Sequence, residues 1–279
     1  MDAVAGTTPK ADAHEPARDR VVYRHSLTVR LTHWVGALAL LVLIMSGLQI
    51  FNAAPYLDAS DDSNPARRVL AFDAGTLPDG KPVGQVIVFG HKFTTTHVLG
   101  YGDDGMGGEA PRAFPASLTL PGYQALADGR LWHLFFAWIF VLCGAAYMIA
   151  GFVRKDLQLL ILRPSDLPKL WPMQAYYLRL RRAPPPYGKY NPLQKAAYTS
   201  VLFVFAPLIV LSGLALSPGI DAIANPLTIV FGGRQFARLW HFAGMLLLLG
   251  FFAIHTFQVA TQGILNQMRS MITGWYQPE

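Results

Sequence analysis

Four histidines lie in stretches of the sequence that contain no Asp, Glu, Lys or Arg. Three of them end a similar four-residue phrase, in which an arginine stands three positions before the histidine: RLTH at 30–33, RLWH at 130–133 and RLWH at 238–241. The fourth, His255, follows His241 by 14 residues. Because neutral imidazole is the commonest metal ligand among side chains, these histidines are the first candidates for chemistry.

The uncharged stretches are long enough to cross a membrane. Of the 279 residues, 52% are hydrophobic and only 14% are charged, and four segments lack charge altogether: 31–53, 131–153, 196–218 and 239–261. At about 1.5 Å per residue, each helix would reach about the 30 Å thickness of a bilayer's hydrocarbon core. We therefore expect an all-α membrane protein, a four-transmembrane-helix bundle with a long extracytoplasmic loop between the first two helices.

The distribution of basic residues predicts the orientation of these helices. Lys and Arg resist translocation and concentrate in cytoplasmic segments. The tail 1–29 carries several basic residues, the loop 154–195 carries nine against two acids, and the loop 54–130 has more acids than bases. We expect both termini and the loop 154–195 in the cytoplasm of a bacterial cell, with 54–130 and 219–238 outside its inner membrane. The net charge of +6 then reflects topology, and we expect no nucleic-acid partner.

Two of the loops are more than simple connections. The loop 54–130 is rich in Gly and Pro, and GQVIVFGHKFTTTHVLG at 84–100 predicts two short β-rich runs about a Gly-His turn. We expect a small cap with little regular structure, placed to receive a partner protein; a floppy loop is the alternative. The segment 164–182, PSDLPKLWPMQAYYLRLRR, is typical of an interfacial helix on the membrane surface.

The depths of the four histidines predict two metal sites. The expected orientation places His133 and His241 near the outer ends of their helices. It places His33 and His255 nearer the inside. His241 and His255 lie about 21 Å apart along one helix, on the same face. We therefore expect two haem b groups stacked across the membrane, each held by two histidines, because a six-coordinate iron is suited to electron transfer. The single cysteine, Cys143, excludes a covalent c-type haem.

Glycines and arginines near the histidines fit this prediction. We expect the porphyrin to lie against the helix backbone at three glycines, with ordinary helix packing as the alternative. We expect one arginine, a turn before each of three histidines, to bind a haem propionate bidentately; an interfacial anchor is the alternative. The glycines are Gly47, Gly144 and Gly244, and the arginines are Arg30, Arg130 and Arg238.

The chain also contains an internal sequence repeat. RLWHLFFAWIF at 130–140 matches RLWHFAGMLLL at 238–248, and LIMSGLQI at 43–50 resembles LIVLSGLAL at 208–216. This pattern indicates two helix pairs that arose by duplication. The first half has Tyr147 where the second has His255, so the inner ligand comes from the first helix instead.

As a whole, these motifs resemble a known family. The chain is similar to the four-helix, di-haem b-type cytochrome subunits of nickel–iron hydrogenases, of formate dehydrogenase (its gamma subunit) and of thiosulfate reductases. The similarity extends over residues 23 to 265. It is carried by RLTHW at 30–34, SGLQIF at 46–51, LPGYQALADGRLWHLFFAW at 120–138, GKYNPLQKAAY at 188–198 and RLWHFAGMLLLLGFFAIHTFQ at 238–258.

The resemblance implies a function. Such subunits carry electrons between a periplasmic redox partner and the quinone pool, with quinone bound near the cytoplasmic haem. The polar motif that opens the third helix matches here Asn191, Gln194 and Lys195, for which an ordinary helix start before Pro192 is the alternative. The longer outer loop argues for a different partner from the usual hydrogenase or formate dehydrogenase. We expect a molybdopterin enzyme or a hydrogenase-type subunit.

Two other functions stay open from the sequence. One is a stand-alone di-haem cytochrome b that oxidises superoxide or a small redox molecule at the outer face, with quinone as acceptor. The other is a haem-free membrane anchor or transporter, which the histidine spacing argues against. For the di-haem function we expect a cytoplasmic tail at 1–29, a four-helix di-haem domain at 30–265 and a C-terminal tail at 266–279, surrounded by membrane lipids.

Overall fold

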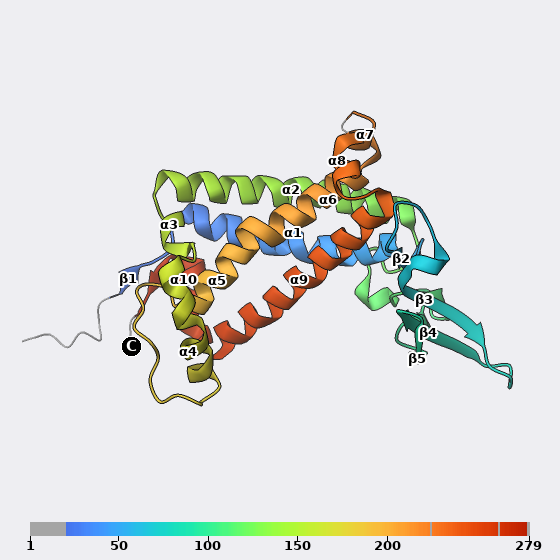
Figure 1. Ribbon diagram of the computed structural model, residues 1–279, viewed down its shortest axis with the longest axis horizontal. Coiled ribbons are helices and arrows are strands. Elements are labelled where there is room, and N and C mark those ends of the chain that lie inside the picture. The colour runs from blue at the N-terminus through green and yellow to red at the C-terminus, as the bar shows by residue number, and fades with distance from the viewer. Residues whose placement is uncertain (1–20, 224, 262, 278–279) are drawn as a thin grey trace, which may run out of the picture.

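The computed structural model describes residues 21–223, 225–261 and 263–277. Within these residues, four helices are long and apolar enough to cross a membrane: α1 (Leu27–Phe51), α2 (Leu126–Val153), the helix Pro192–Leu216 and α9 (Arg234–Thr261). In Figure 1, α1 and α2 run side by side along the long axis of the molecule, and α9 is oblique to them. Each of the four helices overlaps one of the uncharged stretches, so the prediction of a four-helix bundle is confirmed.

The third of these helices has an irregular winding. It consists of α5 (Pro192–Ser200), a π-helical segment η5 (Val201–Phe205) and α6 (Ala206–Leu216). The π-helical segment ends two residues before Pro207, which has no N–H to donate to the preceding turn. The helix begins at a capping box: the Asn191 side chain accepts from the Gln194 N–H at 2.9 Å, and the Gln194 side chain accepts from the Asn191 N–H at 3.1 Å.

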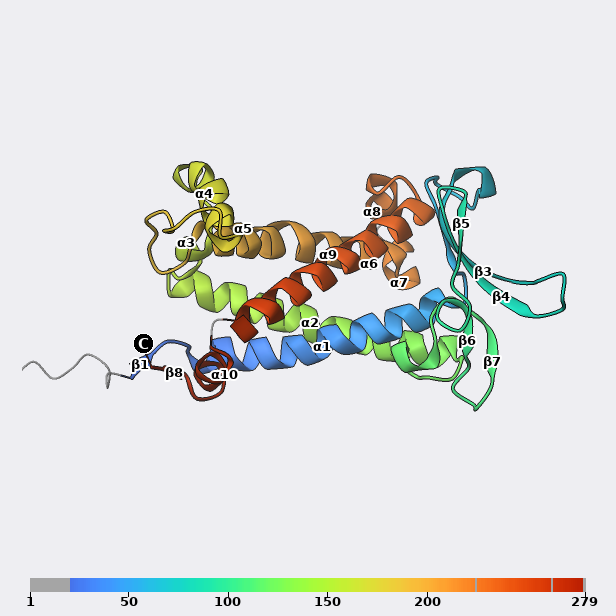
Figure 2. The same ribbon diagram turned by 90° about the horizontal axis from the view of Figure 1, so that it is seen from below.

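One end of the bundle gathers segments from both ends of the described chain, and we call it the termini-side end (Figures 1 and 2). Strand β1 (Val22–Tyr23) pairs antiparallel with β8 (Trp275–Tyr276). The helices α3 (Leu157–Leu160), α4 (Leu167–Tyr177) and α10 (Ile264–Thr273) lie at the same end. The helix expected within 164–182 is therefore found as α4, and the segment expected to be a C-terminal tail forms α10 and β8. Residues 1–20 of the predicted N-terminal tail lie outside the described residues.

The opposite end carries the cap, which we define as residues 54–125, together with the short helices α7 (Pro218–Asp221) and α8 (Asn225–Val230) (Figure 1). The cap contains regular structure, so the expectations of an irregular cap and of an all-α fold were wrong. A four-stranded antiparallel sheet runs in the order β2-β3-β4-β5, and β6 pairs with β7. The strands are β2 (Tyr56–Asp58), β3 (Arg68–Thr76), β4 (Pro82–Val88), β5 (His91–Thr94), β6 (Gly100–Asp103) and β7 (Glu109–Arg112).

The two β-rich runs expected in 84–100 are confirmed as β4 and β5, but the turn between them is Phe89–Gly90 and not Gly90–His91, since His91 already belongs to β5. They form a hairpin in which Val88 pairs with His91 across a two-residue turn. Both turn residues, Phe89 and Gly90, have positive φ angles, of 47° and 81°. This is the backbone that a tight hairpin requires.

The cap folds because its apolar residues share a core with the helix ends. Phe51, at the end of α1, stacks within 5.1–5.8 Å of three other rings: Phe72 of β3, Phe114 of the cap and Phe242 of α9. Leu57 of β2 lies in the same cluster and is only 2% exposed. The cap sheet is short on its own, but with the helix ends it buries enough apolar surface to be stable.

Buried polar side chains join the cap to α1. The Asn52 amide accepts from the Phe114 N–H at 2.8 Å and donates to the Phe114 carbonyl at 3.2 Å. The Gln49 amide donates to the Tyr123 carbonyl at 2.9 Å. Arg112, 4% exposed, donates to the carbonyl oxygens of Phe114 and Gly122 and to the Thr119 hydroxyl. A buried polar group that loses its partner is left without a hydrogen bond. These contacts therefore hold the cap in one position on the bundle.

Asp58 holds the first two cap strands together. Its carboxylate is fully buried and receives hydrogen bonds from Arg68 Nε and the Asn64 N–H, each at 2.9 Å. Burial alone would raise the pKa of Asp58, but the hydrogen bonds from Arg68 and Asn64 outweigh burial and hold this pKa below its ordinary value. The folded cap therefore favours the ionised carboxylate.

Replacing Asp58 tests this role. We expect Asp58→Asn to lower the free energy of unfolding of the cap by about 2 kcal/mol, because it removes charged hydrogen bonds from a buried site. Since the folded pKa is depressed, the contribution of Asp58 is complete above about pH 4 and is lost as the pH falls through the folded pKa. Pulse proteolysis of the cap in urea, at several pH values, measures both effects.

The control is Asp79→Asn. Asp79 also pairs with a cation, Lys81, at 3.1 Å, but the two side chains are 52% and 77% exposed. That change should cost less than about 0.5 kcal/mol. Equal stability of the two variants would show that Asp58 does not hold the sheet.

Candidate functional site

The four histidines lie in two pairs inside the helix bundle. His133 of α2 and His241 of α9 form the cap-side pair, with ring centroids 6.1 Å apart. His33 of α1 and His255 of α9 form the termini-side pair, with ring centroids 6.2 Å apart. The sequence predicted both pairs, and the structure brings together the same partners.

The separation within each pair suits a shared metal ion. Among the described residues, no hydrogen bond joins the two rings of either pair. A bond of about 2 Å from an imidazole nitrogen to a metal on each side would occupy about 4 Å. The rest of the 6.1 Å and 6.2 Å centroid separations is taken up by the two half-rings. The donor set, two neutral imidazoles in an apolar surrounding, is one that iron in a haem accepts.

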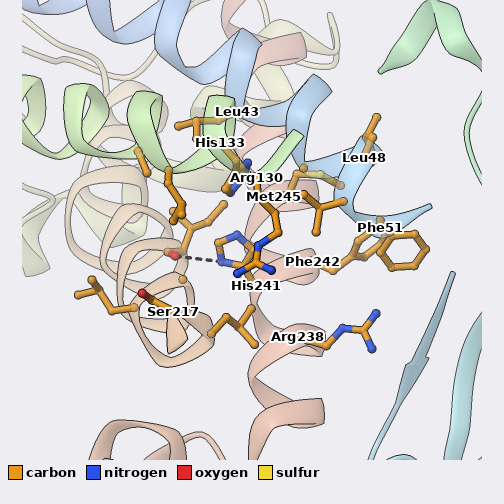
Figure 3. Close-up of a pocket in the computed structure, with 18 of the residues that line it drawn as sticks. Leu43, Leu48, Phe51, Arg130, His133, Ser217, Arg238, His241, Phe242 and Met245 are labelled. Carbon is orange, nitrogen blue, oxygen red and sulfur yellow. Dashed lines mark hydrogen bonds between the residues drawn. The ribbon is translucent and has the colours of Figure 1, made fainter. Parts of the chain in front are cut away.

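A cavity of about 650 Å³ opens beside the cap-side pair. Its walls come from α1, α2, α6 and α9 and are mostly apolar, with Gly47 and Gly213 among the lining residues. Figure 3 shows Arg130 and His133 extending from α2 toward His241 within this cavity. The volume lies in the range of pockets that hold organic cofactors.

Two glycines leave room for the cap-side histidines. A Cβ built at Gly47 would lie 3.3 Å from Cε1 of His133, and one at Gly213 would lie 3.1 Å from Cε1 of His241. Both distances are tighter than ordinary van der Waals contact. Gly47 was predicted to be near a haem, whereas Gly213 was missed.

The other two predicted glycines have different surroundings. A Cβ at Gly144 would meet no atom within 4 Å among the described residues, and one at Gly244 would lie 3.4 Å from Ile209 of α6. Gly244 therefore serves close packing between α9 and α6. Neither glycine lines the cavity beside the cap-side pair.

The three arginines differ in what they contact. Arg130 lines the cavity, and no protein acceptor is found for its guanidinium within the described ranges. Arg238 also lines it, but donates to the Ala54 carbonyl at 2.7 Å and to Gln235 at 2.9 Å, and points toward the cap (Figure 3). Arg30 donates to the Ile272 carbonyl of α10, while its Nε is buried without a protein partner. Arg130 is thus the arginine most available to a carboxylate.

The termini-side pair lies among aromatic side chains. The His255 ring stacks on Phe251, at 5.7 Å and an angle of 17° between the planes. Trp34 stands edge-on to His33 at 5.1 Å. Nδ1 of His33 is buried and has no protein hydrogen-bond partner. Together with the buried Nε of Arg30, it is a polar atom that a bound group could satisfy.

The three predicted quinone residues make protein contacts at the start of α5. Asn191 and Gln194 form the capping box, and Asn191 Nδ2 also donates to the Tyr177 hydroxyl at 3.1 Å. Lys195 Nζ lies 2.9 Å from a carboxylate oxygen of Asp166. The capping box is the ordinary helix start that was weighed as the alternative. Quinone contact at these residues remains a prediction.

Sequence reasoning missed Ser46 and Ser212, which touch the cap-side ligands. Ser46 Oγ lies 3.1 Å from Nδ1 of His133, and Ser212 Oγ lies 3.1 Å from Nδ1 of His241. Each serine directly precedes one of the two glycines that make room for the rings. The sequence similarity between LIMSGLQI and LIVLSGLAL could have indicated these serines, because both segments contain the Ser-Gly dipeptide.

Comparison with known proteins agrees with this geometry. The family model for prokaryotic cytochrome b561 matches residues 24–274. The chain belongs to the prokaryotic cytochrome b561 family. A putative protein-methionine-sulfoxide reductase subunit, YedZ1 of Azospira oryzae, is 26% identical over 244 residues, which are 85% of this chain and 89% of that protein.

Two further relatives of this cytochrome b561-type chain are probable Ni/Fe-hydrogenase B-type cytochrome subunits. The one from Azotobacter chroococcum is 25% identical, and the one from Azotobacter vinelandii is 26% identical. Each match covers 276 residues, 95% of this chain and 92% of the relative. The chain is therefore a cytochrome b561-type, multi-pass membrane subunit for electron transfer, and its family implies haem b.

Gly213 provides a test of the cap-side site. We expect Gly213→Val to displace the His241 ring and to reduce the haem b bound per chain, because Cβ alone would already approach the ring to 3.1 Å. Gly250→Val is the matched control in α9, since a Cβ at Gly250 would meet nothing within 4 Å. Pyridine haemochrome assays of both purified variants measure the difference. Full haem content in Gly213→Val would contradict a ligand role for His241.

Proposed function

We propose that this cytochrome carries electrons through two haem b groups, each held by two histidines, between an extracytoplasmic oxidoreductase partner and the quinone pool. The observation that carries the proposal is the presence of two histidine pairs of nearly equal ring separation, 6.1 Å and 6.2 Å, at two levels of one bundle. His241 and His255 are about 21 Å apart along α9. This spacing gives two redox centres in line across the membrane.

The residues around each pair determine the chemistry. His133 with His241 and His33 with His255 would each hold a haem b, which would supply one-electron redox chemistry. Arg130 is placed to bind a propionate at the cap side, and the buried Nε of Arg30 is placed similarly at the other. The cavity beside the cap-side pair is lined mostly by apolar side chains.

The proposed orientation places the cap outside a bacterial inner membrane and both termini in the cytoplasm. It is supported by the basic loop 154–195, whose helices lie at the termini-side end with β1 and β8. The corresponding domain division is a cytoplasmic tail at 1–29, the di-haem domain at 30–265 and a C-terminal tail at 266–279.

The cap supports a protein partner over a stand-alone enzyme. It is a folded sheet fixed to the helix ends by buried hydrogen bonds, and it stands beside the cap-side pair. The relatives named above are, by name, subunits of a reductase or of hydrogenases. We propose a periplasmic redox subunit of the molybdopterin or hydrogenase type as the donor or acceptor at the cap.

Haem content and ligand variants test the proposal. The purified chain should contain about two b-type haems with low-spin bands. His255→Ala should lose the termini-side haem and quinone reactivity while the cap-side haem stays reducible from outside. His133→Ala should show the reverse. Reduced-minus-oxidised spectra and pyridine haemochrome assays measure this.

His91→Ala is the control for these variants, because His91 is an exposed residue of β5. It should keep both haems. One haem per unmodified chain would mean that one pair is wrongly assigned, and no haem in folded protein would favour a membrane anchor.

The quinone site is tested at Asn191. Asp at this position keeps the helix cap but lacks the Nδ2 donor. If Asn191 contacts quinone, Asn191→Asp should slow haem reduction by added quinol several-fold with haem content unchanged. Tyr177→Phe is the matched control, since it removes the hydroxyl that Asn191 Nδ2 contacts. Equal slowing in both variants would assign the effect to the protein hydrogen bond instead.

A further inference from the structure

The two histidine pairs differ in the hydrogen-bond partners of the ring nitrogen Nδ1. Ser46 and Ser212 are completely buried, and each contacts Nδ1 of one cap-side histidine at 3.1 Å. For the termini-side pair, Nδ1 of His33 is buried without a protein partner, and no hydrogen bond to His255 is found among the described residues. The arginine–histidine motif occurs at both pairs, so it does not account for this difference.

The serine geometry fixes the direction of these hydrogen bonds. A hydroxyl has one hydrogen to donate. Ser46 Oγ lies 2.6 Å from the Val42 carbonyl, and Ser212 Oγ lies 2.6 Å from the Leu208 carbonyl, one turn earlier in each helix. Because the hydrogen goes to the carbonyl, each oxygen can only accept from the imidazole. Nδ1 of the histidine must therefore carry the proton.

A backbone carbonyl reinforces the same tautomer. The Ile209 carbonyl lies 3.1 Å from Nδ1 of His241, and the Leu43 carbonyl is a second hydrogen-bond partner of His133. Both carbonyls belong to the residue three positions before the serine. With Nδ1 protonated, Nε2 of each ring keeps its lone pair for the metal.

We propose that Ser46 and Ser212 are positioning residues that fix the tautomer and orientation of His133 and His241 and hold the reduction potential of the cap-side haem below that of the termini-side haem. This inference rests on the proposed function. When Nδ1 of an imidazole donates a hydrogen bond, Nε2 becomes a stronger ligand for iron and stabilises the ferric state. The effect acts on both cap-side ligands.

The arginines do not supply the same asymmetry. A nearby guanidinium favours the ferrous state, but an arginine precedes a histidine by one turn at both levels, as Arg30 and as Arg130. Arg238 also lines the cap-side cavity and donates only to neutral groups of Ala54 and Gln235, so its charge would raise the cap-side potential and act against the effect of the serines. Among the described residues, hydroxyl oxygens contact the histidine rings only at the cap side. Transfer of one electron from the reduced cap-side haem to the oxidised termini-side haem is then downhill, toward the proposed quinone site.

The experiment is a potentiometric titration of the purified full chain, followed by visible and low-spin EPR spectra. His255→Ala, which keeps the cap-side haem alone, identifies its component. In the double variant Ser46→Ala with Ser212→Ala, the lower-potential component should shift upward and the other should stay in place. Each single variant should give a smaller upward shift, because one of the two hydrogen bonds remains. Ser46→Thr, which keeps the hydroxyl, should restore the original potential.

Ser270→Ala is the matched control. Ser270 is equally buried, but its Oγ donates to the Gln267 carbonyl of α10, so neither potential should move. Selective loss of the cap-side haem from the alanine variants, with both haems kept in Ser270→Ala, would support the positioning role. Two bound haems with unchanged potentials in all serine variants would overturn the inference. An unmodified chain without two haems would instead contradict the proposed function.

Discussion

The fold is organised by the need to hold two buried imidazoles about 6 Å apart without letting them bond to each other. In water each ring would be solvated, and in an apolar bundle each nitrogen must find a partner or remain unsatisfied. The cap-side pair satisfies its outer nitrogens with serine hydroxyls and carbonyls. Its inner nitrogens face a cavity bounded by four helices. Gly47 and Gly213 leave the space that these two rings occupy.

The same constraint explains why the cap is built into the bundle. Phe51 and Phe242 border the cavity and contact each other, and Phe51 also packs edge-on against the cap rings Phe72 and Phe114. The wall of the site and the core of the cap are therefore one packed cluster. Asn52 and Arg112 fix the backbone of the cap over the helix ends. A partner that docks on the cap would contact a rigid extension of the redox site.

Much of this arrangement could be predicted from the sequence. Four uncharged stretches define the spans, because length and lack of charge are sufficient to indicate them. The pairing of His133 with His241 follows from depth, and the 14-residue spacing places His255 on the same face as His241. These are one-dimensional properties of a helix, and they need no knowledge of the neighbours.

The rest depends on how helices rotate against one another. Ser212 and Gly213 lie on a span without histidine, and only its rotation toward α9 shows that they touch His241. Of the cap sheet, the sequence predicted β4 and β5 but not β2 or β3, and the core of the cap is completed by Phe51 and Phe242 from the helices. Gly244 was assigned to haem packing, yet it faces Ile209, a distinction that depends on a few tens of degrees of helix rotation.

The pairing of β1 with β8 has a consequence for biogenesis. Strand β1 comes before the first span, and β8 comes after the last. The N-terminal strand therefore has no partner until all four spans have been made. Arg30 and Trp34, at the start of α1, donate to carbonyls of Ile272 and Met271 in α10. These hydrogen bonds can also form only after the last span has been made. Closure of the termini-side end therefore has to follow the synthesis of all four spans.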